Sequence, residues 1–79
     1  MATIEDYKKA FKETFMVDDD QLAGLSYQDI PEWDSVGHMA LMASLEEVLG
    51  IELDIDDIID FSSYEYGQEI LKKYDVKLS

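Results

Sequence analysis

Apolar side chains return at every third or fourth position in four stretches of this chain, and no stretch shows the alternation typical of a β-strand. This spacing places the apolar residues of each stretch on one side of an α-helix. The chain has 79 residues, which is enough for one domain and too few for a large enzyme. The sequence therefore predicts a single all-α domain spanning residues 1–79.

The first predicted helix covers about residues 3–15, and Thr3 with Asp6 resembles a capping box at its start. Its apolar face consists of Ile4, Tyr7, Phe11, Thr14 and Phe15. A long loop follows over residues 16–33, with Gly24 and the only proline, Pro31. A loop of this length in a small domain is usually functional or held down, and three apolar side chains are suited to hold it: Leu22, Leu25 and Ile30.

The central predicted helix begins at Ser35 and ends near Leu49, and Gly50 stands where a C-terminal cap glycine belongs. We expect its buried face to contain Met39, Met42, Leu45 and Leu49, with Leu41 and Val48 beside them. The two methionines are most simply core residues.

Two shorter elements complete the chain. A turn over about residues 55–60 offers Ile55, Ile58 and Ile59. Ser62 with Glu65 resembles a capping box that opens a last helix, in which Gly67 permits another helix to approach closely. The expected fold is a small four-helix bundle, with three longer helices, one short helix and a long loop between the first and second helices.

The charge of the chain is one-sided. Six lysines, no arginine and 19 acidic residues give a net charge of −13. Both ends of the chain are neutral, so the excess lies in residues 16–61, which hold no Lys or Arg. Nucleic-acid binding and anionic-lipid binding both need cationic patches and are excluded, whereas docking on basic protein surfaces is favoured. High charge that serves only solubility is the simpler alternative.

The sequence also limits the chemistry and location of the protein. The chain contains no cysteine, so any thiol must come from outside, and no disulfide framework can form. No stretch is apolar enough for a membrane span, and the first residues lack the pattern of a secretory signal. We expect a cytoplasmic protein, and a monomer, although nothing in the sequence fixes the oligomeric state.

The most distinctive segment is the junction between the long loop and the central helix, Trp33-Asp34-Ser35-Val36-Gly37-His38. Asp34 suits the N-cap position, which places Ser35 in the first turn, beside the positive end of the helix dipole. Trp33 and His38 then occupy the two positions of a hydrophobic staple. An anion attached to Ser35 is favoured there, while ordinary helix capping by Asp34 and Ser35 is the simpler interpretation.

Two other chemistries are weaker interpretations. Ser35 and His38 lie one helical turn apart, but a hydrolase also needs an oriented base and an oxyanion hole. Asp54 and Asp56 open a segment with EF-hand spacing, but Ile58 and Ile59 stand where an acceptor and a glycine are required. We therefore expect neither a catalytic site nor a specific metal site, although loose divalent binding stays open for a carboxylate cluster of Asp54, Asp56, Asp57 and Asp60.

With these features, the chain resembles a free-standing acyl carrier protein over essentially its whole length. The resemblance rests on the Asp34-Ser35-Val36 motif at the start of the central helix, on Leu45-Glu46-Glu47, on Ile51-Glu52-Leu53, and on Ser62-Ser63 before the last helix. It implies that Ser35 carries a covalent 4′-phosphopantetheine arm, derived from coenzyme A through a phosphopantetheinyl transferase. It also implies a non-catalytic carrier that holds acyl or aminoacyl groups as thioesters.

The resemblance further implies partner enzymes with basic docking surfaces, which activate or transfer acyl groups. The residues expected to contact them are Asp34, Val36, Met39, Glu46 and Glu47. The chain departs from carriers of central fatty-acid synthesis at Glu32, where a glycine is typical, and at Val36, where a leucine is typical. These departures favour a specialised pathway, whose cargo the sequence does not identify.

Two functions of other classes remain alternatives to the carrier. One is an unmodified acidic helical module that docks a basic partner through the same surface. The other is a calcium-responsive helical protein. The mass of the intact protein separates the first from a carrier.

Overall fold

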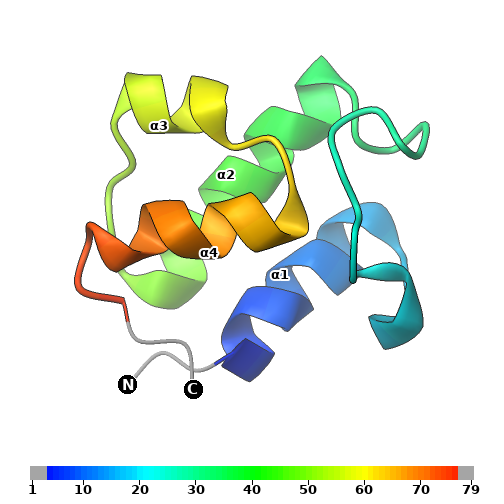
Figure 1. The fold of residues 1–79 in the computed structure, drawn as a ribbon, viewed down its shortest axis with the longest axis horizontal. Helices are drawn as coiled ribbons and strands as arrows, with labels where there is room; N and C mark the ends of the chain where they lie inside the picture. The colour runs from blue at the N-terminus through cyan, green and yellow to red at the C-terminus, as the bar shows by residue number, and fades with distance from the viewer. Residues whose placement is uncertain (1–3, 77–79) are drawn as a thin grey trace.

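The computed structural model describes residues 4–76 (Figure 1). Its elements are α1 (Ile4–Phe15), a turn of 3₁₀ helix η1 (Asp19–Gln21), α2 (Ser35–Leu49), α3 (Ile55–Asp60) and α4 (Tyr64–Lys72). Within these residues, the bridge between Ser26 and Ser63 is isolated and belongs to no strand. The predicted all-α bundle, with one short helix and a long loop before α2, is confirmed. The predicted cap at Thr3 lies outside the described residues.

An aromatic cluster fills the centre of the bundle. Trp33, from the end of the long loop, is fully buried, and its ring lies 5.5 Å from that of Phe11 and 5.1 Å from that of Phe15. Tyr7 extends the cluster toward α4, where its hydroxyl donates to the carbonyl oxygen of Tyr64 at 2.7 Å. Such rings bury large apolar areas and also attract one another, so these aromatic contacts join α1 to the end of the long loop.

The long loop is held down along its length, as predicted. Leu22 and Leu25 are buried and Ile30 is half-buried. Two backbone hydrogen bonds of 2.9 Å also tie the loop to the connection between α3 and α4: Tyr27 N–H donates to the Ser62 carbonyl, and Tyr64 N–H donates to the Leu25 carbonyl.

The buried face of α2 differs from the predicted one. Leu41, Met42 and Leu45 are buried, whereas Met39 is 54% exposed and Val48 is 40% exposed. The face that points inward starts at the half-buried His38 and continues at i+3, i+4 and i+7. The predicted face began one residue later, at Met39, because the polar His38 was not counted as an inward-facing residue. The left-handed C-cap at Gly50, with φ of 67°, is confirmed.

The start of α4 also differs from the prediction. Ser63, rather than Ser62, is the N-cap, and its side chain accepts from Tyr66 N–H at 2.9 Å. Glu65 does not close a capping box; its carboxylate accepts from Gly24 N–H of the long loop at 3.0 Å. The predicted close approach at Gly67 is confirmed, because an added Cβ would overlap the Phe61 ring and the Tyr7 hydroxyl.

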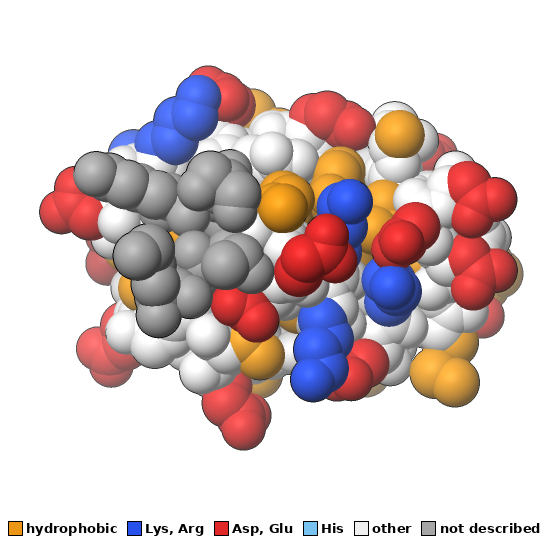
Figure 2. Space-filling view, turned by 90° about the horizontal axis from the view of Figure 1, so that it is seen from below, with side chains coloured by type: hydrophobic (Ala, Val, Ile, Leu, Met, Phe, Trp, Pro, Cys, Tyr) orange, Lys and Arg blue, Asp and Glu red, His pale blue; other side chains and the backbone are white. Residues whose placement is uncertain are grey.

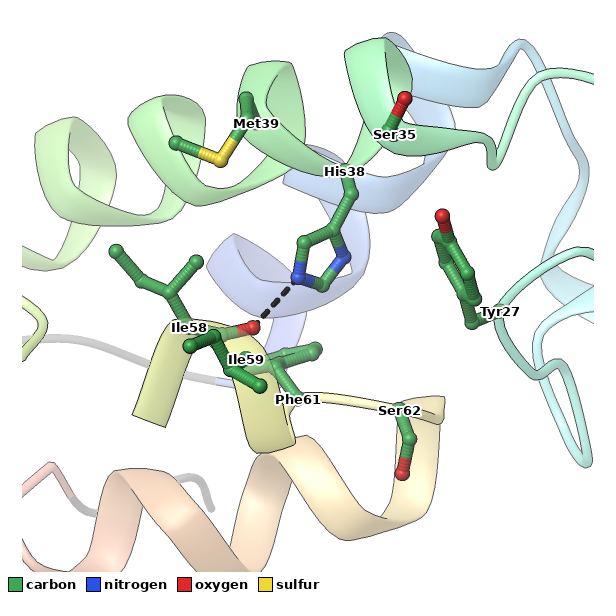
Figure 3. A pocket seen from close by; sticks show the side chains of 8 residues that line it. All are labelled: Tyr27, Ser35, His38, Met39, Ile58, Ile59, Phe61 and Ser62. Carbon is green, nitrogen blue, oxygen red and sulfur yellow. Dashed lines mark hydrogen bonds between the residues drawn. The ribbon is translucent and has the colours of Figure 1, made fainter. Parts of the chain in front are cut away.

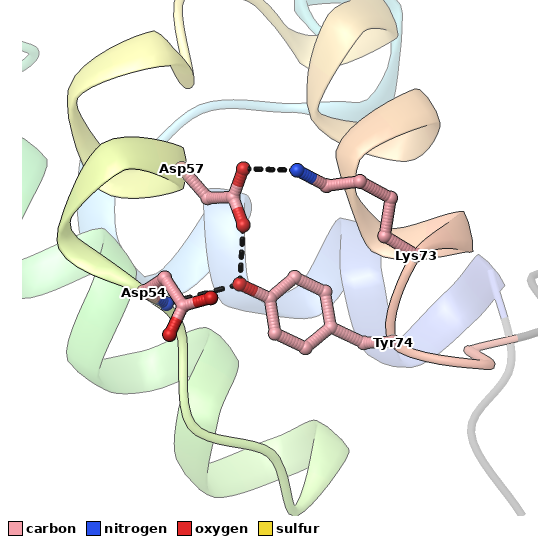
Figure 4. A network of polar contacts seen from close by, with 4 residues as sticks. All are labelled: Asp54, Asp57, Lys73 and Tyr74. Carbon is pink, nitrogen blue, oxygen red and sulfur yellow. Dashed lines mark hydrogen bonds and ion pairs between the residues drawn. The ribbon is translucent and has the colours of Figure 1, made fainter.

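A buried carboxylate holds α3 against the end of α4 (Figure 4). Asp57 accepts hydrogen bonds from the Lys73 ammonium, at 2.5 Å, and from the Tyr74 hydroxyl. The Tyr74 oxygen in turn accepts from Asp54 N–H at 2.9 Å. The hydrogen bonds from Lys73 and Tyr74 hold the pKa of the Asp57 carboxyl below its usual value, despite the opposing effect of desolvation.

Lysines from the two ends of the chain partly compensate the acidic segment. Lys12 contacts Asp19 at 2.9 Å, and Lys73 contacts Asp57. Figure 2 shows lysine side chains beside carboxylates on the face seen from below. In the described part of the chain, Asp19 and Asp57 of residues 16–61 are therefore paired with lysines from outside this segment. The sequence did not suggest these pairs, because each end of the chain has equal numbers of acidic and basic residues.

The lowered pKa of Asp57 makes the free energy of unfolding depend on pH in a known direction. A carboxyl whose pKa is lowered by folding contributes stability above its unfolded pKa of about 4 and loses it as the pH falls through the folded value. We expect Asp57→Asn to lower the free energy of unfolding at neutral pH and this deficit to shrink as the pH falls below the unfolded pKa of about 4 toward the lowered folded value. Urea unfolding at neutral pH and at a series of acidic pH values measures it. Asp56→Asn, an exposed neighbour in α3, is the matched control; equal effects of the two substitutions at neutral pH would contradict this role.

Candidate functional site

The candidate site begins with the N-cap of α2. Asp34 has extended backbone angles, and its Oδ1 accepts from Gly37 N–H at 2.8 Å, while its carbonyl oxygen accepts from His38 N–H at 2.7 Å. The predicted capping role of Asp34 is thereby confirmed. Ser35 is the first residue of α2, and its side chain is exposed.

A glycine lets the long loop lie directly against this first turn. A Cβ added at Gly37 would overlap the backbone carbonyl oxygen of Glu32. The loop therefore approaches the helix more closely than a residue with a side chain would allow. The position of Ser35 relative to the loop depends on this contact.

Trp33 and His38 make the predicted contact across the junction, but it is polar as well as apolar. The rings are nearly parallel, at 14°, and Trp33 Nε1–H donates to His38 Nδ1 at 3.0 Å. Because indole nitrogen is only a donor, Nδ1 must be the unprotonated nitrogen of the imidazole. The ring proton of the neutral His38 is then on Nε2, which lies 2.6 Å from the Ile58 carbonyl oxygen of α3 and donates to it (Figure 3).

The hydrogen bonds of His38 do not suit it as the base of a hydrolytic Ser35–His38 pair. Both ring nitrogens of His38 are engaged, one by Trp33 and the other by Ile58. Neither nitrogen is directed at the Ser35 hydroxyl, and a general base must reach the proton that it removes. The geometry therefore gives Ser35 no base from this histidine.

A pocket of about 350 Å³ opens beside Ser35, between α2, α3 and the long loop (Figure 3). Among the residues that the structure describes, no Asp, Glu, Lys or Arg side chain lines it. Its lining residues are Tyr27, Ser35, His38, Met39, Ile58, Ile59, Phe61 and Ser62. An apolar group attached to Ser35 through a flexible arm would find an apolar surface within the same site.

The residues expected to contact partners differ in exposure and in their hydrogen bonds. Val36 is 77% exposed, and Met39 and Glu47 are also exposed. Glu46 is only half-exposed, and its carboxylate accepts from Leu53 N–H at 2.9 Å. Glu46 therefore has a structural role, since it holds the segment between α2 and α3.

Sequence reasoning did not identify two apolar residues of α3 that the structure exposes. Ile55 and Ile59 of α3 are 73% and 72% exposed, although both are large and apolar. Their spacing of four residues, in a short helix whose other positions include Asp56 and the buried Asp57, was a signal that could have revealed them. The contributions of Tyr27 and Phe61 to the pocket left no such signal, because they come from loops.

The carboxylates of Asp54, Asp56, Asp57 and Asp60 are not gathered around a common point. In the part of the chain from residue 4 to residue 76, no group of three or more His, Asp or Glu side chains could hold a metal ion. Asp57 is instead used by Lys73 and Tyr74. Loose divalent binding by the four aspartates therefore has no gathered ligand set to support it.

Comparisons with known proteins assign no family to the chain. No protein-family model, no curated protein and no solved structure matches it. None of the described helices is long and apolar enough to cross a bilayer. The functional conclusion therefore depends on the residues and geometry of the junction at Ser35.

The different surroundings of Glu46 and Glu47 lead to a stability prediction. We expect Glu46→Ala to lower the free energy of unfolding by about 1 to 2 kcal/mol, because Leu53 N–H loses a charged acceptor. Glu47→Ala, one residue along the same helix, should change it by less than about 0.5 kcal/mol. Urea unfolding of both variants measures the difference. Glu46→Gln keeps an acceptor oxygen and should recover most of the loss; equal losses in the two alanine variants would refute the structural role.

Proposed function

We propose that this chain is a carrier protein of the acyl-carrier type, modified at Ser35 with 4′-phosphopantetheine from coenzyme A. The thiol of the arm holds acyl or aminoacyl groups as thioesters and presents them to other enzymes. One observation carries the proposal: an exposed serine hydroxyl at the first residue of α2 borders an apolar pocket. The absence of cysteine agrees with it, because a carrier of this kind imports its thiol.

The residues around Ser35 fit a phosphodiester. In the first turn of α2, the N–H groups of Ser35 and Val36 have no intrahelical acceptor, and the helix dipole favours an anion there. Residues 16–61 include no Lys or Arg that could retain a free phosphate compound. A covalent bond is therefore the plausible way to keep such an anion at this acidic site.

The chain itself does not carry out the modification; it is the substrate of a transferase. The Ser35 oxygen forms a bond to the phosphorus nearest the pantetheine part of coenzyme A, and the pyrophosphate bond breaks. The adenosine bisphosphate leaves, and the serine proton passes to a base of the transferase. Asp34 contributes by fixing the first turn, so that the hydroxyl is held on a rigid element.

The charge distribution supports docking on basic partner enzymes that activate or transfer acyl groups. Asp34 lies beside Ser35 and Glu47 lies further along α2, while exposed Val36 and Met39 supply apolar contact area between them. Glu46 belongs to this surface only in part, because it also binds Leu53 N–H. Carboxylates of this kind mainly raise the rate of association and give it a salt dependence.

An unmodified acidic interaction module is the second candidate. The observation that favours it is the exposure of four large apolar side chains, Val36, Met39, Ile55 and Ile59, of which Met39 and Ile59 line the same pocket. Exposed apolar side chains of this kind could bind a partner without any prosthetic group. The two candidates differ in one measurable property, which is whether Ser35 becomes modified.

The carrier proposal predicts a specific change in mass. Incubation with coenzyme A and a broad-specificity phosphopantetheinyl transferase should add one phosphopantetheine unit to the wild-type chain and none to Ser35→Ala, as measured by intact-protein mass spectrometry. Ser62→Ala, at another serine of the same pocket, is the control and should be modified normally. A wild-type chain that stays unmodified under these conditions would favour the interaction module.

The docking surface predicts an effect on the rate of the same reaction. We expect Glu47→Lys to slow transfer of the arm several-fold at low salt, with the difference shrinking as salt screens the charges. The matched control is Glu13→Lys, which makes the same charge change at an exposed site on α1. Initial rates measured at two ionic strengths test this. Equal slowing by both variants would mean that net charge, rather than the α2 surface, controls the rate.

A further inference from the structure

His38 connects three parts of the molecule through one side chain. It belongs to α2, its Nδ1 accepts from Trp33 of the long loop, and its Nε2–H donates to the Ile58 carbonyl of α3. The faces and edges of the imidazole meet aromatic rings, with Tyr27 at 5.6 Å and Phe61 at 6.3 Å. The orientation of the ring is therefore fixed by two hydrogen bonds and by packing.

The helix that His38 holds cannot keep its position alone. With six residues, α3 is far shorter than a helix that is stable by itself in water. Asp57, on another side of α3, is tied to the end of α4 by Lys73 and Tyr74. The bond from His38 to Ile58 is the corresponding tie to α2, and both residues line the pocket beside Ser35.

We propose that His38 is a latch that joins α2 to α3 and sets how far the pocket beside Ser35 opens. Figure 3 shows the His38 to Ile58 bond among the residues that form the pocket wall. Movement of α3 away from α2 must break this bond, so an occupant that widens the pocket has to offset its loss. The consequence for cargo on the arm rests on the proposed function, whereas the latch itself does not.

The two hydrogen bonds of His38 can be separated by substitution. An asparagine side chain ends near the position of Nδ1, so His38→Asn keeps an acceptor for Trp33 but does not reach Ile58. A glutamine side chain reaches the position of Nε2, so His38→Gln keeps a donor for Ile58. If His38 only fills space, the two substitutions should loosen α3 to a similar extent. If its bond to Ile58 holds α3, His38→Asn should loosen α3 more than His38→Gln.

The first test measures the amide hydrogen exchange of α3 in the Ser35→Ala background, where no arm is present. We expect His38→Asn to speed exchange at Ile58, Ile59 and Phe61 roughly threefold to tenfold, the effect of one lost hydrogen bond, and His38→Gln to change it much less. Tyr74→Phe, which weakens the tie to α4, is the control for general loosening. Equal exchange in His38→Asn and His38→Gln would overturn the latch.

The second test measures pocket opening with 1-octanol, a neutral apolar probe. Chemical-shift changes at the Ile58 and Ile59 amides report its binding. A ligand that requires a partly populated state gains affinity when that state becomes commoner, so His38→Asn should bind octanol several-fold more tightly than His38→Gln or the parent chain. Equal affinities would show that the bond does not limit opening. Neither test involves the arm, so the role of His38 can be refuted while the carrier proposal stands, and the mass measurement can refute the carrier proposal while the role of His38 stands.

The parent chain supplies a third test, which requires no variant to fold. Nitrogen NMR of the imidazole should show the proton of the neutral ring on Nε2, with Nδ1 unprotonated. A neutral ring that carries its proton on Nδ1 instead would leave Nε2 without a proton to donate to the Ile58 carbonyl, and would overturn the proposal.

Discussion

The fold is organised around the burial of Trp33, the largest of the fully buried side chains. Its indole brings a large apolar area to the core together with one N–H that must find an acceptor, and leaving such a group unpaired costs about 1 to 3 kcal/mol. His38 supplies that acceptor from the first turns of α2. The loop, α1 and α2 are thus fixed to one another at a single side chain, two residues before Ser35.

The strongly acidic segment constrains the fold in a different way. Its carboxylates repel one another, and the structure relieves this in two places by bringing in lysines from α1 and from the end of α4. Neither pair includes a residue of the junction at Ser35. The pairing helps to hold η1 and α3 in place.

Much of this structure could be predicted from the sequence because helix periodicity and capping are local. The start of α2, its cap at Asp34 and its end at Gly50 depend on neighbouring residues, and each was predicted correctly. The predicted buried face of α2 was displaced because the polar, half-buried His38 is the first inward-facing residue of the helix and is held there by Trp33 of the loop and Ile58 of α3. The roles of Asp57 and Glu65 were missed because their partners lie 16 and 41 residues away along the chain, and residue type and spacing do not show such pairs. The role of Glu46 was missed for another reason: its partner is a backbone N–H, that of Leu53, in the irregular segment after α2, and no side chain marks it in the sequence. Whether Ser35 is modified stays a prediction.

Trp33 is also an intrinsic fluorescent probe of the structure around it. It is the only tryptophan in the chain, so its emission reports on one place alone. Its indole stacks against Phe15 and the His38 imidazole, directly beside the junction. Any event that rearranges the start of α2 can therefore be followed in the unlabelled protein, in real time and at low concentration.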